Sequence, residues 1–230
     1  MYSTILLDIE GTTTPIDFVH KILFPYAKER VRGYVSDNYS QLATEMRLLR
    51  GECDDDAEYA SEITGPESAA DYLEYLIDKD RKSTPLKTIQ GLIWRTGYEN
   101  GSLKAIVYKD VPDAFRRWTS KGKSVAIYSS GSVLAQKLLF AHTELGDLTE
   151  YISDYFDTHF GNKTAPKSYS YICSKLGGQA ENVLFVSDSM NELEAAKAAG
   201  LDTRLSIRPG NEEVQDYKGH VSIETLDELE

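Results

Sequence analysis

Two carboxylates follow the first apolar segment of the chain and are the side chains best suited to chemistry. The apolar residues Ile5–Leu7 lead into Asp8 and Glu10, and Gly11 follows at once. In an extended segment, side chains two positions apart project to the same side, so these two carboxylates would lie together. A divalent cation or a shared proton relieves such repulsion, and Asp8 can also attack phosphorus to form an aspartyl-phosphate. The structural alternative is a solvated turn after a buried strand.

Hydroxyl groups follow the second apolar run. Ser129 and Ser130, with Gly131 and Ser132, come directly after Val125–Tyr128 and before a segment with helical spacing. Unpaired N–H groups at a helix N-terminus, together with hydroxyls, form a site for an anion such as phosphate. Capping of the helix by Ser130 or Ser132 is an equally direct interpretation.

A lysine on a glycine turn and a second pair of acids come later in the chain. Lys163 follows Gly161 by two positions and can supply a point charge to a phosphate. Lys167 competes for that role, and most lysines simply lie on the surface. Asp188 follows the third apolar run, and Glu192 comes four positions later. This pair repeats the carboxylates of the first run, although Asp188 could instead cap a helix.

The order of these groups along the chain indicates a single sheet. Short apolar runs alternate with segments of helical spacing, which is typical of a parallel sheet covered by helices. We expect strands at Ile5–Asp8, Ser124–Tyr128, Val183–Val186 and Thr203–Ile207. We also expect Asp110 to cap the helix before the second strand. Parallel strands present their carboxyl ends at one edge, so the acids, serines and lysine would meet there. The predicted fold class is α/β, with a doubly wound parallel-sheet (Rossmann-like) core.

A long insertion separates the first two strands. Residues 17–103 are too many for one crossover and have mostly helical spacing. Because this segment begins directly after the turn that carries Asp8 and Glu10, we predict an inserted helical cap domain that covers the strand ends and excludes water. The core would then comprise residues 1–16 and 104–230. The alternative is a second structural domain with no lid function.

The overall composition argues against several classes of function. The 230 residues carry a net charge of −12, which suits neither nucleic acid nor anionic membranes as a partner. No apolar stretch is long enough for a membrane span, and residues 1–4 lack the features of a signal peptide. Cys53 and Cys173 are far apart and predict neither a disulfide framework nor a zinc site. We therefore expect a cytoplasmic protein, with a further nuclear fraction if its source is a eukaryote.

Taken in chain order, these motifs resemble the haloacid dehalogenase superfamily of phosphohydrolases, and the resemblance covers essentially the whole chain. Most phosphatases of that superfamily carry a second aspartate where this chain has Glu10. Together with Phe18–Val19 and Leu23–Tyr26, Glu10 resembles the acireductone synthase family, the bifunctional enolase-phosphatases of methionine salvage. The further stretches that support this narrower resemblance are 80–87, 90–91, 128–132, 136–140 and 208–211.

The resemblance implies a Mg²⁺-dependent monomer that acts on a small molecule, 2,3-diketo-5-methylthiopentyl 1-phosphate. Such an enzyme enolises this substrate and then removes phosphate, which leaves the acireductone 1,2-dihydroxy-3-keto-5-methylthiopentene. It also implies that Asp8, the backbone carbonyl of Glu10 and Asp188 hold Mg²⁺, with Glu192 as a secondary candidate. Asp8 would attack phosphorus, and Glu10 would serve as acid and base. The residues implied to bind phosphate are Ser129, Ser130 and Lys163.

The base that enolises the substrate is left open by the sequence. Glu10 is the most economical candidate, and His20 and Lys87 of the expected cap are weaker ones. Metal coordination would lower the barrier by stabilising the enolate. Apolar cap residues could meet the methylthio group, although packing inside the cap is the stronger interpretation for each of Phe18, Leu23 and Trp94.

Two other classes share part of this pattern. A signalling receiver domain also combines an acceptor aspartate, a hydroxyl and a lysine, but it is much shorter, lacks the insertion and carries the acceptor on a later strand. The second class is a different capped phosphatase, or a dehalogenase that needs no metal. Glu10 and Asp188 favour a metal, and phosphoester hydrolysis with and without a chelator would separate these alternatives.

Overall fold

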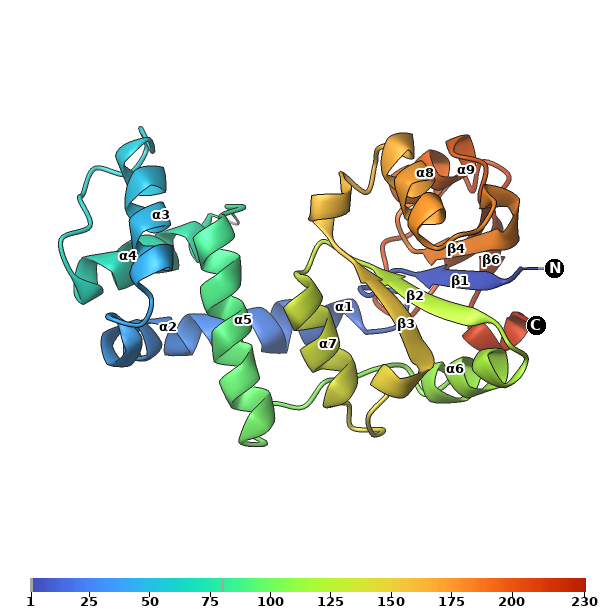
Figure 1. The fold of residues 1–230 in the computed structure, drawn as a ribbon, viewed down its shortest axis with the longest axis horizontal. Coiled ribbons are helices and arrows are strands. Elements are labelled where there is room, and N and C mark those ends of the chain that lie inside the picture. The colour runs from blue at the N-terminus through green and yellow to red at the C-terminus, as the bar shows by residue number, and fades with distance from the viewer. Residues whose placement is uncertain (1, 80) are drawn as a thin grey trace. The chain divides into compact units, whose positions relative to one another are not determined.

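The computed structural model describes residues 2–79 and 81–230. Met1 of the stretch 1–4 and Asp80, the first residue of the stretch 80–87, lie outside the described residues. The chain divides into two compact units (Figure 1). We call residues 1–19 and 104–230 the core unit, and residues 20–103 the helical unit.

A six-stranded sheet, parallel throughout, forms the centre of the core unit in the order β3-β2-β1-β4-β5-β6. The strands are β1 Thr4–Leu7, β2 Ser124–Tyr128, β3 Ile152–Phe156, β4 Val183–Ser187, β5 Asp202–Ser206 and β6 Val221–Ile223. The predicted α/β class with a doubly wound parallel sheet is confirmed. Strand β1 lies in the middle, and the chain builds β2 and β3 on one side of it and β4 to β6 on the other.

Helices cover both faces of this sheet, with α6 and α7 on one face and α8 and α9 on the other (Figure 1). Their bounds are α6 Val111–Ser120, α7 Val133–Ala141, α8 Pro166–Lys175 and α9 Met190–Ala198, after the short α1 Ile16–Phe18. Short 3₁₀ helices lie at Thr149–Tyr151, Thr158–Phe160, Ala180–Asn182 and Leu226–Glu228. A strand covered on both faces needs apolar side chains at every position. Accordingly Ile5, Leu6 and Leu7 of β1 are fully buried.

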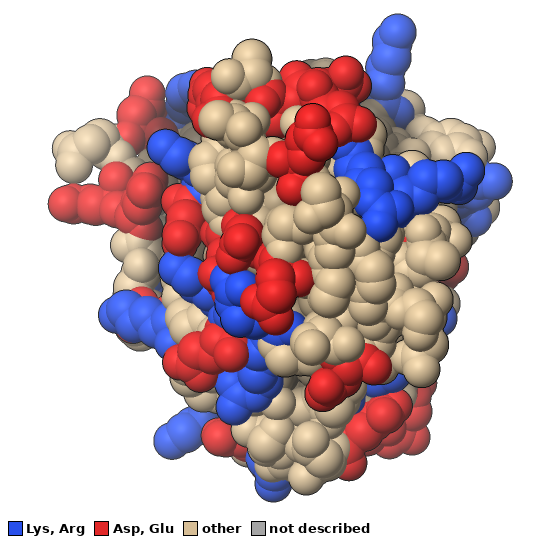
Figure 2. Space-filling view, turned by 90° about the vertical axis from the view of Figure 1, so that its left-hand side faces the viewer, with Lys and Arg blue, Asp and Glu red and all other residues tan. Residues whose placement is uncertain are grey.

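The helical unit begins at His20, within a π-helical turn. Its elements are that turn, Val19–Leu23, then α2 Phe24–Asn38, α3 Ala43–Asp54, α4 Pro66–Asp78 and α5 Thr84–Glu99. Arg32 of α2 makes ion pairs of 2.7 to 2.8 Å with three acids of α4, Glu67, Asp71 and Glu74. Figure 2 shows acidic and basic groups interspersed over the side of the molecule where α3 and α4 lie. The helical character expected of this segment is present, and its role as a cap stays a prediction.

None of the helices in residues 2–79 and 81–230 combines the length and the apolar character that crossing a membrane requires. The two cysteines, Cys53 in α3 and Cys173 in α8, are both buried as free thiols.

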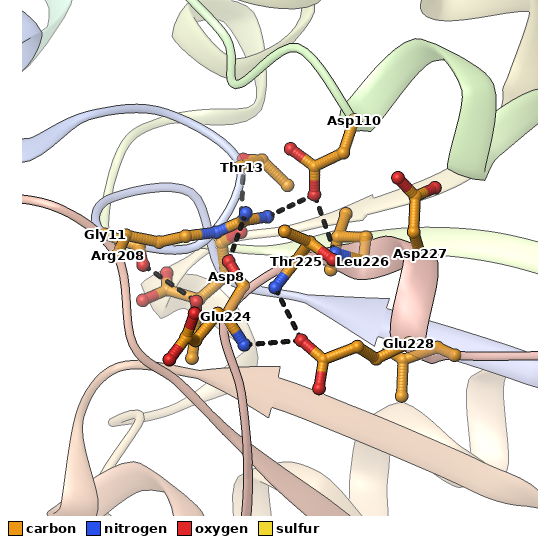
Figure 3. A network of polar contacts seen from close by, with 12 residues as sticks. Asp8, Gly11, Thr13, Asp110, Arg208, Glu224, Thr225, Leu226, Asp227 and Glu228 are labelled. Atoms are coloured by element: carbon orange, nitrogen blue, oxygen red, sulfur yellow. Dashed lines mark hydrogen bonds and ion pairs between the residues drawn. The ribbon is translucent and has the colours of Figure 1, made fainter.

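The predicted position of Asp110 at the start of α6 is confirmed, but a capping role of its side chain is wrong. Asp110 stands at the N-cap position, but its carboxylate makes no capping bond. Instead, Asp110 Oδ2 lies 2.6 Å from Arg208 Nη2 and also accepts the Leu226 N–H at 2.6 Å. Figure 3 shows this buried pair together with the C-terminal residues Glu224 and Leu226, which it ties to the start of α6. A buried guanidinium competes more strongly for a carboxylate than a helix N–H does, because each ion would be costly alone.

Candidate active site at the carboxyl edge of the sheet

Asp8 lies directly after β1, at the point where the strand order of the sheet reverses. Its N–H still donates to the Val186 carbonyl of β4 at 3.0 Å, so the sheet register continues through this residue. The Asp8 side chain is buried. Ligands of open α/β sheets bind at such a reversal, outside the carboxyl ends of the strands. The strand therefore delivers a carboxylate to the expected place.

Residues 8–14 form a turn, which we call the carboxylate turn, that is closed by its own hydrogen bonds. The Thr13 hydroxyl reaches the carbonyls of Asp8 and Ile9, at 3.2 and 3.3 Å, and the Gly11 N–H donates to the Thr14 carbonyl at 2.8 Å. Gly11 has a φ of +63°, in the left-handed region that favours glycine. Glu10, between these residues, is half-buried and forms an isolated β-bridge with Thr14. Asp8 and Glu10 thus lie on a turn that its own hydrogen bonds hold closed.

Lys163 lies 155 positions after Asp8 in the chain, and its side chain reaches the Asp8 carboxylate. Its Nζ lies 2.6 Å from Asp8 Oδ1 and 2.7 Å from Glu192 Oε2. The lysine is 8% exposed, so its charge is held among these acids and not in solvent. The structure brings together three of the residues that sequence analysis singled out, from the end of β1, from the connection between β3 and α8, and from helix α9.

Two tyrosines explain why Lys163, and not Lys167, enters the site. The Tyr128 hydroxyl donates to the Gly161 carbonyl at 3.1 Å, and the Tyr169 hydroxyl donates to the Lys163 carbonyl at 2.7 Å. Gly161 has a φ of +124°, which allows the chain to turn sharply just before the lysine. Lys167 lies on α8 and is exposed. The backbone on either side of Lys163 is therefore fixed so that its side chain enters the sheet edge.

The charges of the site are unbalanced when every acid is ionised. Burial opposes the charged form of Lys163, but the Asp8 and Glu192 carboxylates outweigh it and raise the lysine pKa. Burial, followed by the nearby Asp8 and Glu192 charges, raises the pKa of Asp188 to about 7. Burial and the Asp8 carboxylate also raise the pKa of Glu192. Three carboxylates against one ammonium leave a net charge of −2 in a largely buried space.

These acids carry more negative charge than Lys163 can offset, and a bound divalent cation would offset the rest. Mg²⁺ is usually held by one or two carboxylates together with substrate phosphate oxygens and water. Within the described residues, no three His, Cys, Asp or Glu side chains form a ready-made metal cage. Asp8 and Asp188, the two carboxylates of the predicted set, would therefore share a cation with backbone, substrate and solvent oxygens, and a charge of +2 would offset the excess.

Residues 129–132, which we call the serine loop, follow β2, the strand next to β1, and so lie at the same edge of the sheet. The Ser129 side chain is buried, and its Oγ accepts the Gly131 N–H at 3.2 Å. Ser132 Oγ accepts the Ala135 N–H, so the capping interpretation is right for Ser132. Ser130 is exposed. Phosphate binding by Ser129 and Ser130 stays a prediction.

Sequence analysis missed Ser187, the last residue of β4. Its hydroxyl lies 3.0 Å from Glu192 Oε2 and 3.4 Å from Asp8 Oδ2, and it accepts the Ser189 N–H at 3.1 Å. It thus bridges two of the acids. The available signal was its position, since a hydroxyl residue ends the third apolar run just as Ser129 follows the second. The alternative in which Asp188 caps α9 is wrong, because Ser189 holds the N-cap position.

The other candidates for the enolase step belong to the helical unit, apart from Phe18, which is buried in the core unit. Trp94 Nε1 donates to the Leu23 carbonyl at 2.9 Å, and both residues are buried, as expected of packing within that unit. The roles of His20 and Lys87 in enolisation, and of the apolar residues around the methylthio group, stay predictions.

The family model for haloacid dehalogenase-like hydrolases matches residues 2–200 of the chain. Among curated proteins, an Enolase-phosphatase E1 of Synechococcus elongatus is 48% identical, with 99% of this chain and 97% of the relative covered. An Enolase-phosphatase E1 of Leptospira borgpetersenii is also 48% identical, over 90% of this chain and 89% of the relative.

A solved structure extends the likeness to three dimensions. The crystal structure of the UTR4 protein from Saccharomyces cerevisiae matches with a TM-score of 0.83 and 38% identity, and the match covers 98% of each chain. This chain therefore resembles known proteins in sequence and in fold over nearly its whole length. The chain belongs to the haloacid dehalogenase-like hydrolases and, among them, to the Enolase-phosphatase E1 family.

Proposed function

We propose that this protein converts 2,3-diketo-5-methylthiopentyl 1-phosphate to the acireductone 1,2-dihydroxy-3-keto-5-methylthiopentene and phosphate, a step of methionine salvage. The relatives' name supplies the two activities, enolisation and phosphate removal. The observation that supports the phosphatase half in this chain is the contact of Lys163 with both Asp8 and Glu192 beside Asp188. Acids and an ammonium at the carboxyl edge suit attack on a phosphate ester.

In the phosphatase half, an oxygen of Asp8 attacks phosphorus and the bond between phosphorus and the substrate's C1 oxygen breaks. Lys163 lies 2.6 Å from Asp8 Oδ1, where its charge offsets the negative charge of the arriving phosphoryl group. Glu10 donates a proton to the leaving oxygen. It then accepts a proton from the water that splits the aspartyl-phosphate, which restores both acids. Ser129 and Ser130 hold the phosphate oxygens through hydroxyl and backbone N–H groups.

In the enolase half, a base removes a proton from the carbon next to a carbonyl group, and the carbonyl oxygen gains negative charge. Glu10 is the candidate closest in sequence to the nucleophile, and its longer side chain reaches farther than the aspartate usual at this position. A bound Mg²⁺ would supply positive charge for the enolate and for the phosphoryl group. Asp8, the Glu10 carbonyl and Asp188 would hold it, with Glu192 as a secondary candidate.

The test is an assay with two signals on the diketo phosphate, which follows enol absorbance and phosphate release separately. Wild type should give both, and a chelator should abolish phosphate release until Mg²⁺ is restored. Asp8→Asn keeps the shape of the side chain but removes the nucleophile, so enol should accumulate while phosphate release is lost. Asp154→Asn, an exposed aspartate of β3, is the matched control and should behave as wild type.

Different failures of this assay have different meanings. Phosphate release by Asp8→Asn at the wild-type rate would overturn Asp8 as the nucleophile. Hydrolysis of generic phosphate esters, with neither signal from the diketo phosphate, would reduce the function to that of another Mg²⁺-dependent small-molecule phosphatase of the superfamily. Phosphate release that a chelator leaves unchanged would remove the metal from the mechanism.

A further inference from the structure

The side-chain amides of Asn211 and Gln136 each link one loop of this site to the end of a strand. Asn211 Nδ2 donates to the Gly11 carbonyl at 2.9 Å and to the Ser206 carbonyl, at the end of β5, at 3.0 Å. Ser206 Oγ donates to the same Gly11 carbonyl at 3.0 Å. The turn that carries Asp8 is thereby joined to a strand two positions away in the sheet. Asn211 Oδ1 is buried without a hydrogen-bond partner.

Gln136 makes the same arrangement on the other side of β1. Its Nε2 donates to the Gly131 carbonyl of the serine loop and to the Phe156 carbonyl at the end of β3, both at 2.8 Å. The side chain is 1% exposed, and Oε1 is buried without a hydrogen-bond partner. Each carboxamide thus uses both N–H groups on backbone carbonyls of one active-site loop and one strand end.

Only a carboxamide can do this without adding charge. A hydroxyl has a single donor and cannot join two carbonyls, whereas lysine or arginine would bring a buried cation to a site that already holds Lys163. Leaving a buried carbonyl oxygen unpaired costs about 1–3 kcal/mol. Both carboxamides leave one oxygen unpaired and both link two backbone carbonyls. Because the same costly arrangement occurs twice at one site, chance packing explains it poorly.

The links also set the direction of the next N–H group. Because a trans peptide unit is planar, its C=O and N–H point in opposite directions. Holding the Gly131 carbonyl therefore fixes the Ser132 N–H, and holding the Gly11 carbonyl fixes the Thr12 N–H, which donates to the Ile9 carbonyl at 3.2 Å. A loop whose peptide units cannot rotate presents its groups to a ligand in one orientation.

We propose that Gln136 and Asn211 are positioning residues, with Gln136 holding the serine loop for phosphate binding and Asn211 holding the carboxylate turn for catalysis. The inference rests on the proposed phosphatase site and assigns a separate role to each of its two loops. Loss of the Gln136 link weakens the binding of the phosphate group. Loss of the Asn211 link misplaces Glu10 and Asp8 while substrate binding is kept.

The experiment uses Gln136→Met and Asn211→Leu, which keep the approximate volume but remove both donors. We expect Gln136→Met to raise KM, and the dissociation constant of inorganic phosphate measured by calorimetry, about tenfold, with kcat little changed. We expect Asn211→Leu to lower kcat about tenfold with KM little changed. Hydrogen exchange should quicken in residues 129–132 of the first variant and in residues 8–14 of the second, and in neither case in the other loop.

Trp118→Phe is the control for lost stability. It removes one buried N–H bond to a backbone carbonyl, that of Leu229, near the start of β2 at the opposite edge of the sheet. It should lower Tm while leaving KM, kcat and exchange in both loops unchanged. The inference would be wrong if both test variants changed the same kinetic parameter, KM or kcat. It would also be wrong if hydrogen exchange quickened in both loops of either variant. Failure of the proposed function shows separately, because the wild-type protein would then give neither enol nor phosphate from the diketo phosphate.

Discussion

Lys163 Nζ lies 2.6 Å from Asp8 Oδ1, although 155 positions separate these residues in the chain. Glu192 Oε2 is 2.7 Å from the same nitrogen. One buried ammonium thus serves two carboxylates. Since buried ions are tolerated only when they are paired, each member of this group affects both the stability and the chemistry of the site.

Lys163→Met is expected to lower phosphate release at least about a hundredfold, because the charge beside Asp8 is removed. Tm should also fall, by about 10 °C, since two buried acids are left without a counter-ion. Combining this change with Glu192→Gln removes one of those acids. The double variant should recover part of the lost Tm but not activity, which thermal melts and phosphate assays would show together.

Lys167→Met is the matched control for this prediction, since Lys167 lies four positions later in the chain and is exposed. It should leave both Tm and activity as in wild type. Activity of Lys163→Met within tenfold of wild type would contradict the role of its charge in phosphoryl transfer.

The stability of the metal-free protein is expected to fall as pH rises from about 4 to about 7. Burial and the charges of Asp8 and Glu192 raise the folded-state pKa of Asp188 to about 7, from 3.8. A carboxyl with a raised folded-state pKa contributes its full stability below the unfolded pKa and loses it as pH passes through the folded one. Asp188→Asn, in chelator, should match wild-type Tm at pH 4 and below, begin to exceed it near pH 5 and exceed it by several degrees near pH 8.

Magnesium should reverse this difference. A divalent cation binds the ionised acids, so added Mg²⁺ should raise wild-type Tm more at pH 8 than at pH 5. Asp188→Asn should gain little at either pH. Melting curves of the two proteins that stay parallel across pH in chelator would show that Asp188 is not the group that titrates.

The strands that carry the site were the easiest part of the fold to predict from sequence. The four predicted strands lie within one residue of β1, β2, β4 and β5. The runs of β1, β2 and β4 are largely apolar because helices cover both faces of these strands. The two edge strands were missed: β3 has exposed Ser153 and Asp154 in its middle, and β6 has only three residues. Edge strands need fewer apolar side chains and so leave a weaker pattern.

Contacts between distant segments could be predicted only where strand topology requires them. Lys163, Asp8 and Asp188 converge because parallel strands share one carboxyl edge. The Asp110 carboxylate could not be assigned in this way, because its position favours helix capping and its partner Arg208 lies 98 positions away. The hydrogen bonds from Asn211 to the Gly11 and Ser206 carbonyls could not be predicted either, since side-chain bonds to backbone carbonyls leave no periodic signal in a sequence.

Breaking the Asp110–Arg208 pair should destabilise the protein more than any surface ion pair. The two side chains are 10% and 4% exposed, and Arg208 Nη1 also donates to the Glu224 carbonyl at 2.6 Å. Arg208→Met leaves Asp110 buried and unpaired, so the free energy of unfolding should fall by about 3–5 kcal/mol. Urea unfolding would measure this, and adding Asp110→Asn should recover part of the loss.

Arg116→Met provides the surface comparison, because its pair with Asp113 is 61% and 69% exposed. Removing that pair should leave the free energy of unfolding close to that of wild type, because water and salt screen both charges. Equal losses in Arg116→Met and Arg208→Met would refute the importance of burial. The Tyr108 ring lies 4.5 Å from the Arg208 guanidinium, and the Tyr108 N–H donates to Thr13 of the carboxylate turn. Arg208→Met should therefore also lower kcat modestly.

Gly11→Ala is expected to impair Mg²⁺ binding as well as folding. A Cβ at this position would lie 2.3 Å from Asp188 Oδ2 and 2.8 Å from Asn211 Oδ1. Asp188 would have to move, and a displaced ligand should weaken Mg²⁺ binding about tenfold or more, measured by calorimetry. The φ of +63° adds roughly 1–2 kcal/mol of backbone strain.

Two further glycines separate the clash from the strain. Gly122 has a φ of +75° with nothing within 4 Å of its Cβ position, so Gly122→Ala carries the strain alone and should lower Tm but keep Mg²⁺ affinity. Gly131 has Ser129 Oγ at an ordinary 3.6 Å, so Gly131→Ala places a methyl group in the serine loop without a clash and should change neither property much. If Gly11→Ala bound Mg²⁺ as tightly as Gly122→Ala does, Asp188 would not be a ligand, because the added methyl group cannot share the space that its carboxylate now occupies.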